Sequence, residues 1–167
     1  MDMIREMLTD RGYQPSREIN ACDVWARPGH ADIFVAQTFY PKISISILKD
    51  FLVKLEDMGG EHCILIYEDD VTPHVRELAR LKTAPPIIEL FQTCELAFNV
   101  TRHQLQPRFE CLTSDQAAAI GQRFGVLGLP KMRSEDPIAR YYNWPKGTIV
   151  RVIPPDTSLQ TSYRVVK

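Results

Sequence analysis

Apolar and polar positions in the first half of the chain alternate between strand-like and helix-like periods. Two compact apolar runs, at residues 31–37 and 63–67, have the length and composition of strands buried on both faces, and residues 86–91 are a further strand candidate. Between the first two runs, apolar residues recur at helical spacing from Ile47 to Met58, with Ser46 placed as N-cap and Gly59 at the end. The order strand, helix, strand predicts a parallel pair with a right-handed crossover.

Two further helix signals complete this unit. Residues 4–8 keep helical spacing before Gly12, which is typical of a short opening helix. Thr72 is placed as an N-cap with Pro73 at the first helical position. Together these signals predict an α/β layer with a mainly parallel sheet over about residues 31–91.

After residue 91 the pattern changes to short helices and a terminal strand pair. Thr113 and Gln116 have the spacing of a capping box that opens a helix ending before Gly125. Asp136 and Pro137 indicate the start of a second, two-turn helix. Two β-branched runs read as antiparallel strands: residues 147–153 and 162–166. We therefore expect an α+β protein of two domains, at residues 1–92 and 93–167.

Charge separates the two halves as well. The formal net charge is −1, but residues 1–100 hold 10 Lys and Arg against 16 Asp and Glu, whereas residues 101–167 hold 10 against 5. One interpretation is a basic unit that meets an acidic partner or nucleic acid; the other is uneven decoration of a solvated surface.

Most motifs that carry chemistry are absent from the sequence. Its eight glycines form no phosphate-binding loop, and no G-x-S-x-G elbow occurs. The four cysteines, at positions 22, 63, 94 and 111, lie far apart, so reduced and mostly buried thiols are expected, with neither a metal site nor a cofactor. The longest apolar run covers only residues 63–67, so no transmembrane helix is expected and the protein should stay inside the cell.

Asp32 is the main candidate for catalysis, because an acid at the start of a strand is one ligand of a metal-dependent nuclease. Such a site needs a second acid and a lysine on the neighbouring strand, and Lys42 is preceded two positions earlier by Tyr40 rather than by an acid. The segment 68–70 is acidic but is typical of a solvated turn before a helix. The segment Thr72–Pro73–His74 starts a helix. In one interpretation the free backbone N–H groups at this helix start bind a phosphate; in the other, the segment is an ordinary helix cap without a ligand.

The basic half offers arginines beside aromatic residues. Arg140 lies between Ala139 and Tyr141, an arrangement found both in buried packing and in partner anchors. Arg151 and Arg164 lie on the two terminal strands, either as one basic face for carboxylates or phosphates or as ordinary exposed arginines.

Several separated motifs, in order, resemble a known family. They are DRGY at 10–13, ELF at 89–91, NVTRHQL at 99–105, LPK at 129–131, DPIARY at 136–141, GTIVRVI at 147–153 and YRVV at 163–166. The part after residue 89 looks like the assembly domain of the fifth, shared subunit of eukaryotic nuclear RNA polymerases, which is similar to a small subunit of the archaeal polymerase. The resemblance is weaker before residue 89.

The resemblance implies a non-catalytic polymerase subunit without cofactor, metal, membrane contact or small-molecule substrate. Residues 1–92 would form a shortened jaw of nuclease-like topology beside downstream double-stranded DNA, with Thr72, Pro73 and His74 nearest to it. The second domain would dock on the largest subunit and neighbouring small subunits. Its docking or domain-defining residues would be Leu129, Pro130, Asp136, Pro137, Ala139, Arg140, Tyr141, Arg151, Tyr163 and Arg164.

The chain departs from the family pattern in the short jaw and in the segment 154–161. Such drift suits a virus-encoded copy or a specialised paralogue, so the expected location is the nucleus, or a virion or viral factory. Two alternatives stay open at this stage: a divergent metal-dependent nuclease that uses Asp32, and a free-standing adaptor whose basic domain binds nucleic acid.

Overall fold

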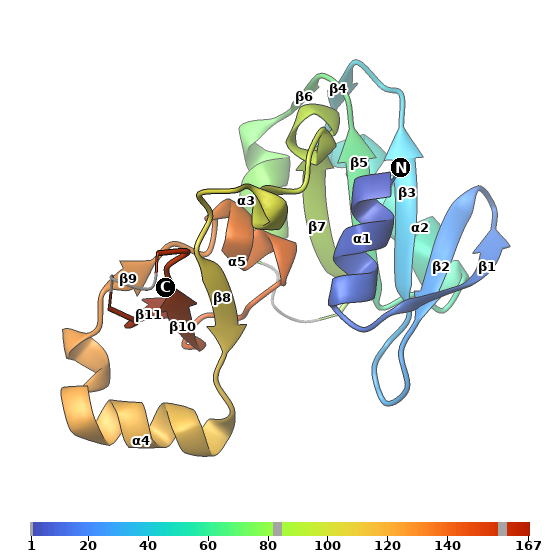
Figure 1. Cartoon of the computed structure of the whole chain (residues 1–167). Coiled ribbons are helices and arrows are strands. Elements are labelled where there is room, and N and C mark those ends of the chain that lie inside the picture. The colour runs from blue at the N-terminus through green and yellow to red at the C-terminus, as the bar shows by residue number, and fades with distance from the viewer. Residues whose placement is uncertain (1, 82–84, 157–159) are drawn as a thin grey trace. The chain divides into compact units, whose positions relative to one another are not determined.

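The computed structural model describes residues 2–81, 85–156 and 160–167, and the chain forms two compact units (Figure 1). The units are Met1–Phe98 and Asn99–Lys167, so the division falls a few residues after the predicted boundary at residue 92. Each unit has its own sheet, helices and core. Both units mix helices with strands, as expected for an α+β protein.

The N-terminal unit is built on a five-stranded mixed sheet of order β1-β2-β3-β5-β7. Its strands are β1 (Gln14–Ile19), β2 (Cys22–Ala26), β3 (Ile33–Thr38), β5 (His62–Tyr67) and β7 (Ile87–Gln92). The predicted parallel arrangement is confirmed for β3, β5 and β7, but β1 and β2 add an antiparallel hairpin that the sequence pattern did not predict. The sheet as a whole is therefore half antiparallel rather than mainly parallel.

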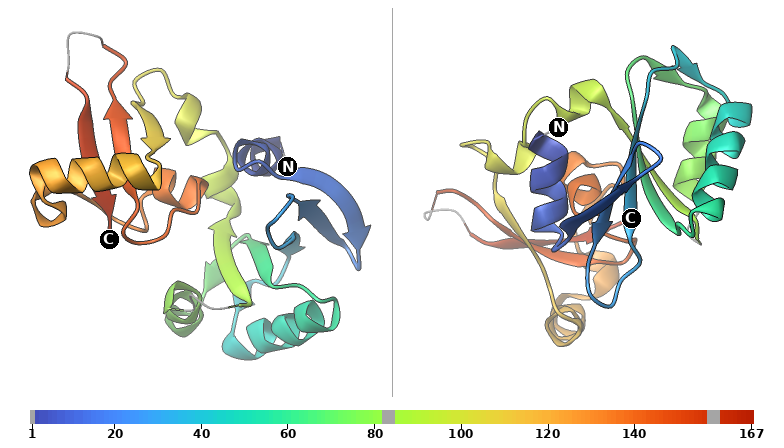
Figure 2. Two further views of the ribbon diagram at one scale, coloured as in Figure 1. Left: turned by 90° about the horizontal axis from the view of Figure 1, so that it is seen from below. Right: turned by 90° about the vertical axis from the view of Figure 1, so that its right-hand side faces the viewer.

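Helices cover both faces of this sheet. Helix α1 (Asp2–Asp10) lies on one face, and α2 (Ile45–Asp57) and α3 (Pro73–Leu81) lie on the other (Figure 2). A short parallel pair, β4 (Lys42–Ile43) with β6 (Asp70–Val71), adjoins the carboxyl ends of β3 and β5 (Figure 1). Ser44 caps α2 by accepting a hydrogen bond from the Ile47 N–H, so the predicted cap at Ser46 was wrong by two residues.

The C-terminal unit is a four-stranded sheet of order β8-β10-β11-β9. Its strands are β8 (Arg108–Cys111), β9 (Lys131–Met132), β10 (Ile149–Ile153) and β11 (Ser162–Val166). The predicted antiparallel pair of terminal strands is confirmed, while β8 and β9 were not predicted. The described residues also form three 3-10 turns: η1 (Thr93–Leu96) in the N-terminal unit, and η2 (Val100–Arg102) and η3 (Val126–Gly128) in this one.

The two faces of this second sheet carry different helices. Ile149 and Val165 point to the face that packs on α4 (Ser114–Phe124), whereas Val150 points to the face that packs on α5 (Pro137–Tyr141). The predicted capping box of Thr113 with Gln116 is present at the start of α4. The two faces therefore present separate surfaces.

Candidate docking site and jaw turn

Helix α5 forms where the sequence supplies both a cap and a rigid first turn. The Asp136 carboxylate accepts a hydrogen bond of 2.9 Å from the Ile138 N–H, and Pro137 occupies the first turn, where its missing N–H has no intrahelical partner to lose. Ile138, Ala139 and Tyr141 are all at most 4% exposed. The helix is only five residues long, so this packing rather than propensity holds it in place.

Aromatic rings gather beside α5. The rings of Tyr142 and Trp144 stack with centroids 4.8 Å apart, and Tyr141 meets Tyr142 edge to face at 4.9 Å. Phe109, which comes from β8, lies 6.5 Å from Trp144. Each such pair stabilises the fold by about 0.5–1.5 kcal/mol in addition to the contribution of the apolar area that it buries. These contacts hold the rings together as one platform.

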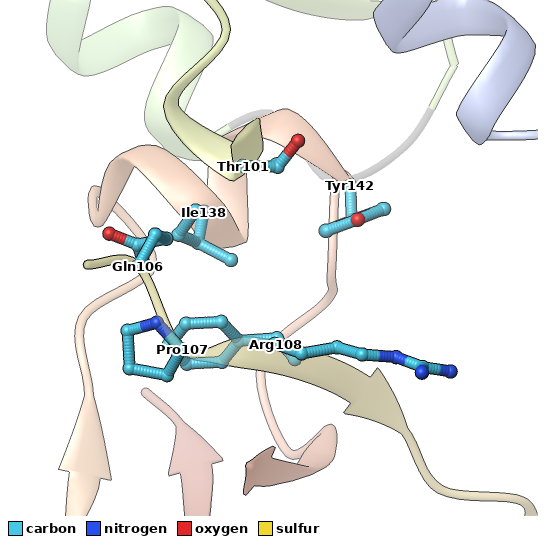
Figure 3. A pocket seen from close by; sticks show the side chains of 7 residues that line it. Thr101, Gln106, Pro107, Arg108, Ile138 and Tyr142 are labelled. Carbon is cyan, nitrogen blue, oxygen red and sulfur yellow. The ribbon is translucent and has the colours of Figure 1, made fainter. Parts of the chain in front are cut away.

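A hollow of about 290 Å³ opens on this platform (Figure 3). It is lined by Thr101, Gln106, Pro107, Arg108, Phe109, Ile138 and Tyr142. The lining mixes polar groups of Thr101, Gln106 and Arg108 with the rings of Phe109 and Tyr142. The exposed guanidinium of Arg108 pairs with Glu110 at 2.8 Å. A hollow of this size and chemistry suits one anchoring side chain of a protein partner, since tyrosine, tryptophan and arginine are enriched where partners dock.

Several residues expected to dock or to define the domain are buried. Leu129, Ala139 and Tyr141 are between 1% and 6% exposed, and the Tyr141 hydroxyl accepts a hydrogen bond of 3.1 Å from the Asn99 amide. Their position favours a role in defining the domain. Pro130 and Pro137 are exposed at the ends of elements.

The terminal-strand arginines do not form one basic face. Arg151 is opposite Tyr163 in the ladder and Arg164 is opposite Val150, and directly opposed residues share a face while neighbours along a strand alternate. Arg151 therefore lies on the α4 face and Arg164 on the α5 face. Arg151 approaches Glu110 at 3.5 Å and lies 6.0 Å over the Tyr163 ring, and Arg140 is half-buried.

The sequence reasoning missed most of the residues that line the hollow. Thr101, Gln106 and Phe109 come from the segment around η2 and β8, and β8 is too short and too polar to be seen as a strand. The run of aromatic residues after Arg140 was the one available signal, because it placed Tyr142 and Trp144 close to α5.

The turn expected near DNA is a well-tied helix start. The Thr72 N–H donates to the Ile43 carbonyl at 3.1 Å, and the Thr72 carbonyl accepts from the Arg76 N–H at 3.1 Å. Pro73 and His74 are exposed beside it. The structure thus places all three residues at the end of the unit where β4 and β6 lie.

Acidic residues beside this turn are partly balanced by cations. Asp70 lies 3.8 Å from both Lys42 and Arg76, and all three side chains are 59–64% exposed. The Gln92 amide donates to the carbonyls of Glu68 and Asp69 at 3.1 and 2.9 Å. The segment 68–70 is therefore an ordered, solvated turn, as expected.

A buried charged cluster, not anticipated from the sequence, joins α1 to the sheet. Arg11 donates two hydrogen bonds of 2.8 Å to Glu89, and the His62 ring lies 2.7 Å from the same carboxylate. Burial alone would raise the pKa of Glu89, but the charge of Arg11 and the hydrogen bonds from His62 and Arg11 outweigh it and lower that pKa to about 2. No lining residue of the hollow belongs to this cluster, so we assign it to the stability of the N-terminal unit.

The geometry around Asp32 does not assemble a nuclease centre. Its carboxylate is 3.7 Å from Arg17, a cation rather than a metal ligand. Within the described ranges, no three His, Cys, Asp or Glu side chains are grouped to hold a metal ion.

The cysteines follow the expectation only in part. All four are free; Cys22 and Cys63 are buried, but Cys94 and Cys111 are exposed. Desolvation raises the pKa of the Cys22 and Cys111 thiols, which disfavours reactive thiolates. Among the residues that the structure describes, no helix is long and apolar enough to cross a membrane.

Comparison with known proteins identifies relatives of the C-terminal unit. The family model described as RNA polymerase Rpb5, C-terminal domain, matches residues 98–166. This range coincides with the second compact unit, Asn99–Lys167.

Curated relatives carry the same kind of name. A Dictyostelium discoideum protein named DNA-directed RNA polymerases I, II, and III subunit rpabc1 is 29% identical over 119 residues, which cover 69% of this chain and 60% of that protein. The RPABC1 subunits of Caenorhabditis elegans and Caenorhabditis briggsae are each 26% identical over 135 residues, covering 77% of this chain and 64% of theirs. The matched regions thus span somewhat less than two thirds of these relatives.

A solved structure of an ATP-dependent Type ISP restriction-modification enzyme bound to DNA aligns with a TM-score of 0.39 and 16% identity, over 78% of this chain and 11% of that one. A TM-score at this level does not establish a common fold.

Proposed function

We propose that the protein is a non-catalytic structural subunit of a multisubunit DNA-directed RNA polymerase, because its second unit matches the model of the Rpb5 C-terminal domain. The observation that carries the proposal is the match of the whole second unit to that family, together with relatives named as subunits shared by polymerases I, II and III. The predicted resemblance is thereby confirmed. The nuclease alternative gains no support from the geometry of Asp32.

The C-terminal unit docks the protein, in this proposal, on the largest polymerase subunit and on neighbouring small subunits. The hollow beside α5 supports this role because Tyr142 and Phe109 line it together with the exposed Arg108. Seven of the predicted docking residues retain exposed surface: Pro130, Asp136, Pro137, Arg140, Arg151, Tyr163 and Arg164. The buried Leu129, Ala139 and Tyr141 shape the surface from below.

The N-terminal unit acts, in this proposal, as a jaw beside downstream DNA, with Thr72, Pro73 and His74 closest to the duplex. An acidic unit cannot hold DNA by itself, since affinity for the backbone comes largely from cations that neutralise phosphates. Contact with DNA therefore depends on the rest of the polymerase. The names of the relatives support the nucleus as the site of action, and nothing among them supports the virion alternative.

Co-purification of the tagged full chain with the polymerase tests the docking proposal. We expect the wild-type chain to bring down the largest subunit, and Tyr142→Ala and Arg108→Glu to reduce that yield severalfold. The matched control is Lys54→Glu, which reverses an exposed charge on α2. Thermal melting of each variant checks that it is folded, and Arg108→Glu should melt like the wild type because Arg108 is exposed.

Three results contradict the proposal. One is a wild-type chain that never brings down the largest subunit. Another is a pair of folded hollow variants that assemble as well as the control. The third is tight, salt-sensitive DNA binding by the full chain without polymerase, which would favour the free-standing adaptor.

A further inference from the structure

We propose that the α4 face of the C-terminal unit is a second protein-docking surface, which takes an acidic polypeptide segment with apolar anchor residues. This surface, called here the α4 patch, consists of Phe124, Val126, Leu127 and Tyr163 with the cations Arg123, Lys131 and Arg151 around it. It lies on the sheet face opposite to the hollow beside α5. The inference goes beyond the proposed function, because it gives the unit a second partner surface.

The apolar part of the α4 patch is exposed because α4 covers its sheet face incompletely. No residue of α4 is buried, although Ala117 and Ile120 touch the core. Gly125, with φ of 71°, turns the chain out of the helix into η3. The result is an exposed fraction of 49% for Phe124 and 86% for Leu127.

This exposure is concentrated rather than scattered. Three large apolar side chains, Phe124, Val126 and Leu127, are exposed within four consecutive positions, and Tyr163 extends the group, since its ring lies 6.3 Å from that of Phe124. Elsewhere in the described chain, Val53, Phe98 and Leu105 are exposed singly, and Phe39 with Tyr40 forms a smaller exposed pair. Single exposed apolar residues are ordinary, whereas a contiguous patch with a polar rim marks an interaction site.

The charge around the patch selects the partner. The Arg123 guanidinium lies 5.0 Å over the Phe124 ring, and Arg151 lies 6.0 Å over Tyr163. Lys131 shares the face because it is in register with Val165, whose side chain packs in the core beneath α4. Within residues 85–156 and 160–167, Arg123 and Lys131 form no ion pair, so both are available to a partner's carboxylates.

Two other occupants fit the patch less well. A second copy of the chain would place this basic rim against itself, and like charges across an interface cost several kcal/mol. Duplex DNA would satisfy the cations but would leave the apolar centre against a phosphate backbone, with nothing to bury it. An acidic segment with leucine or phenylalanine anchors satisfies both parts of the patch.

The test uses the full chain and a pair of short probe peptides. One peptide carries Leu and Phe anchors among Glu residues, and the other has Lys in place of every Glu. We expect the acidic peptide to bind and to shift the backbone amide signals of residues 123–131 in a nuclear magnetic resonance titration. The lysine peptide should bind at least about tenfold more weakly, because its positive charges repel the cations of the rim.

Matched variants locate the binding. Leu127→Asp should lower the affinity for the acidic peptide at least about tenfold. Leu105→Asp, which alters another strongly exposed leucine outside the patch, should leave that affinity unchanged. Arg123→Glu should lower the affinity for the acidic peptide severalfold, whereas Arg164→Glu, on the opposite face of the sheet, should leave that affinity unchanged. Both Leu127 and Arg123 are exposed, so the variants remain folded.

Four outcomes overturn the proposal. They are no signal shift at about 1 mM acidic peptide, equal binding of the two peptides, shifts at the patch that grow with protein concentration alone, and preferential binding of a DNA duplex there. The third would indicate a second copy and the fourth nucleic acid. Because none of these readouts involves the polymerase, failure here is distinguishable from failure of the proposed function.

Discussion

The two units of this chain solve the problem of holding a small fold together in different ways. Both units bury apolar residues on both faces of their sheets, but the N-terminal unit also ties its first helix down with the buried cluster of Arg11, Glu89 and His62. The C-terminal unit relies on helix caps and stacked aromatic rings, and its ion pair of Arg151 with Glu110 is about one third exposed.

The difference follows the work proposed for each unit. A jaw that braces DNA needs internal rigidity and little adhesive surface, so its strongest electrostatic contacts are internal. A docking unit needs exposed aromatic and basic groups, so its arginines and aromatic rings lie near the surface. Isolated ion pairs at the surface contribute little to the stability of the fold. Four changes test this contrast, from the largest effect to the smallest.

The largest effect is expected for Glu89→Gln. The change leaves the Arg11 guanidinium buried without its carboxylate, and breaking one side of a buried pair costs about 3–5 kcal/mol. Urea denaturation of the full chain should show this loss as a lower midpoint for the unfolding of the N-terminal unit. The control Glu77→Gln, on the exposed side of α3, should be almost neutral, and equal midpoints for the two variants would contradict the assigned role of the cluster.

Acid should weaken the N-terminal unit through the same carboxylate. The pKa of Glu89 falls from an ordinary 4.5 to about 2, so the folded state binds its proton less readily than the unfolded state. The stabilisation is therefore full above about pH 4.5 and is lost as the pH falls toward about 2, with a size of a few kcal/mol. Denaturation midpoints measured across this range should fall more steeply for the wild type than for Glu89→Gln. Parallel slopes would contradict the prediction.

Removing the caps should produce an intermediate effect in the C-terminal unit. Thr113→Ala and Asp136→Ala each delete a side chain that accepts a backbone N–H at the start of a helix, at a cost of about 1 kcal/mol. Thermal melting followed by circular dichroism measures the loss. Thr113→Ser, which keeps the hydroxyl, is the control; if it loses as much as Thr113→Ala, the cap is not the cause.

The smallest effect is expected for Glu110→Gln. The carboxylate pairs with Arg151 at 3.5 Å and with Arg108 at 2.8 Å, but its side chain is 31% exposed and that of Arg108 is 76% exposed. Such pairs contribute at most about 1 kcal/mol. If Glu110→Gln loses as much stability as Glu89→Gln in the same denaturation assay, the proposed difference between the buried ion pairs of one unit and the exposed ion pairs of the other is contradicted.

Local signals in the sequence predicted two helix starts of the C-terminal unit and the three parallel strands of the N-terminal unit, although the cap of α2 was placed two residues too late. Thr113 with Gln116 and Asp136 with Pro137 mark helices that form as expected. The buried strands β3, β5 and β7 were found because all are apolar and bounded by turn residues. These signals are carried by neighbours along the chain, so a pattern can show them.

The missed features depend on contacts between distant residues. The hairpin of β1 and β2 turns on Asn20 and Ala21, both with positive φ, without the glycine that usually announces such a turn, and β1 has no apolar face. Arg11 and Glu89 are 78 positions apart, and nothing near either residue announces the pair. Phe109 joins the hollow only because β8 pairs with β10. Thr101 lies within a family motif but was not singled out as a site residue, and Gln106 and Phe109 were missed because tertiary pairing brings them to the hollow.

Recovery of the largest polymerase subunit with the tagged chain tests the central claim most directly. We expect the wild-type chain and Lys54→Glu to recover equal amounts of the largest subunit, and the folded Arg108→Glu variant to recover severalfold less. If the wild-type chain, correctly folded and expressed with the polymerase, recovers none of the largest subunit, the claim that this protein is a polymerase subunit is contradicted.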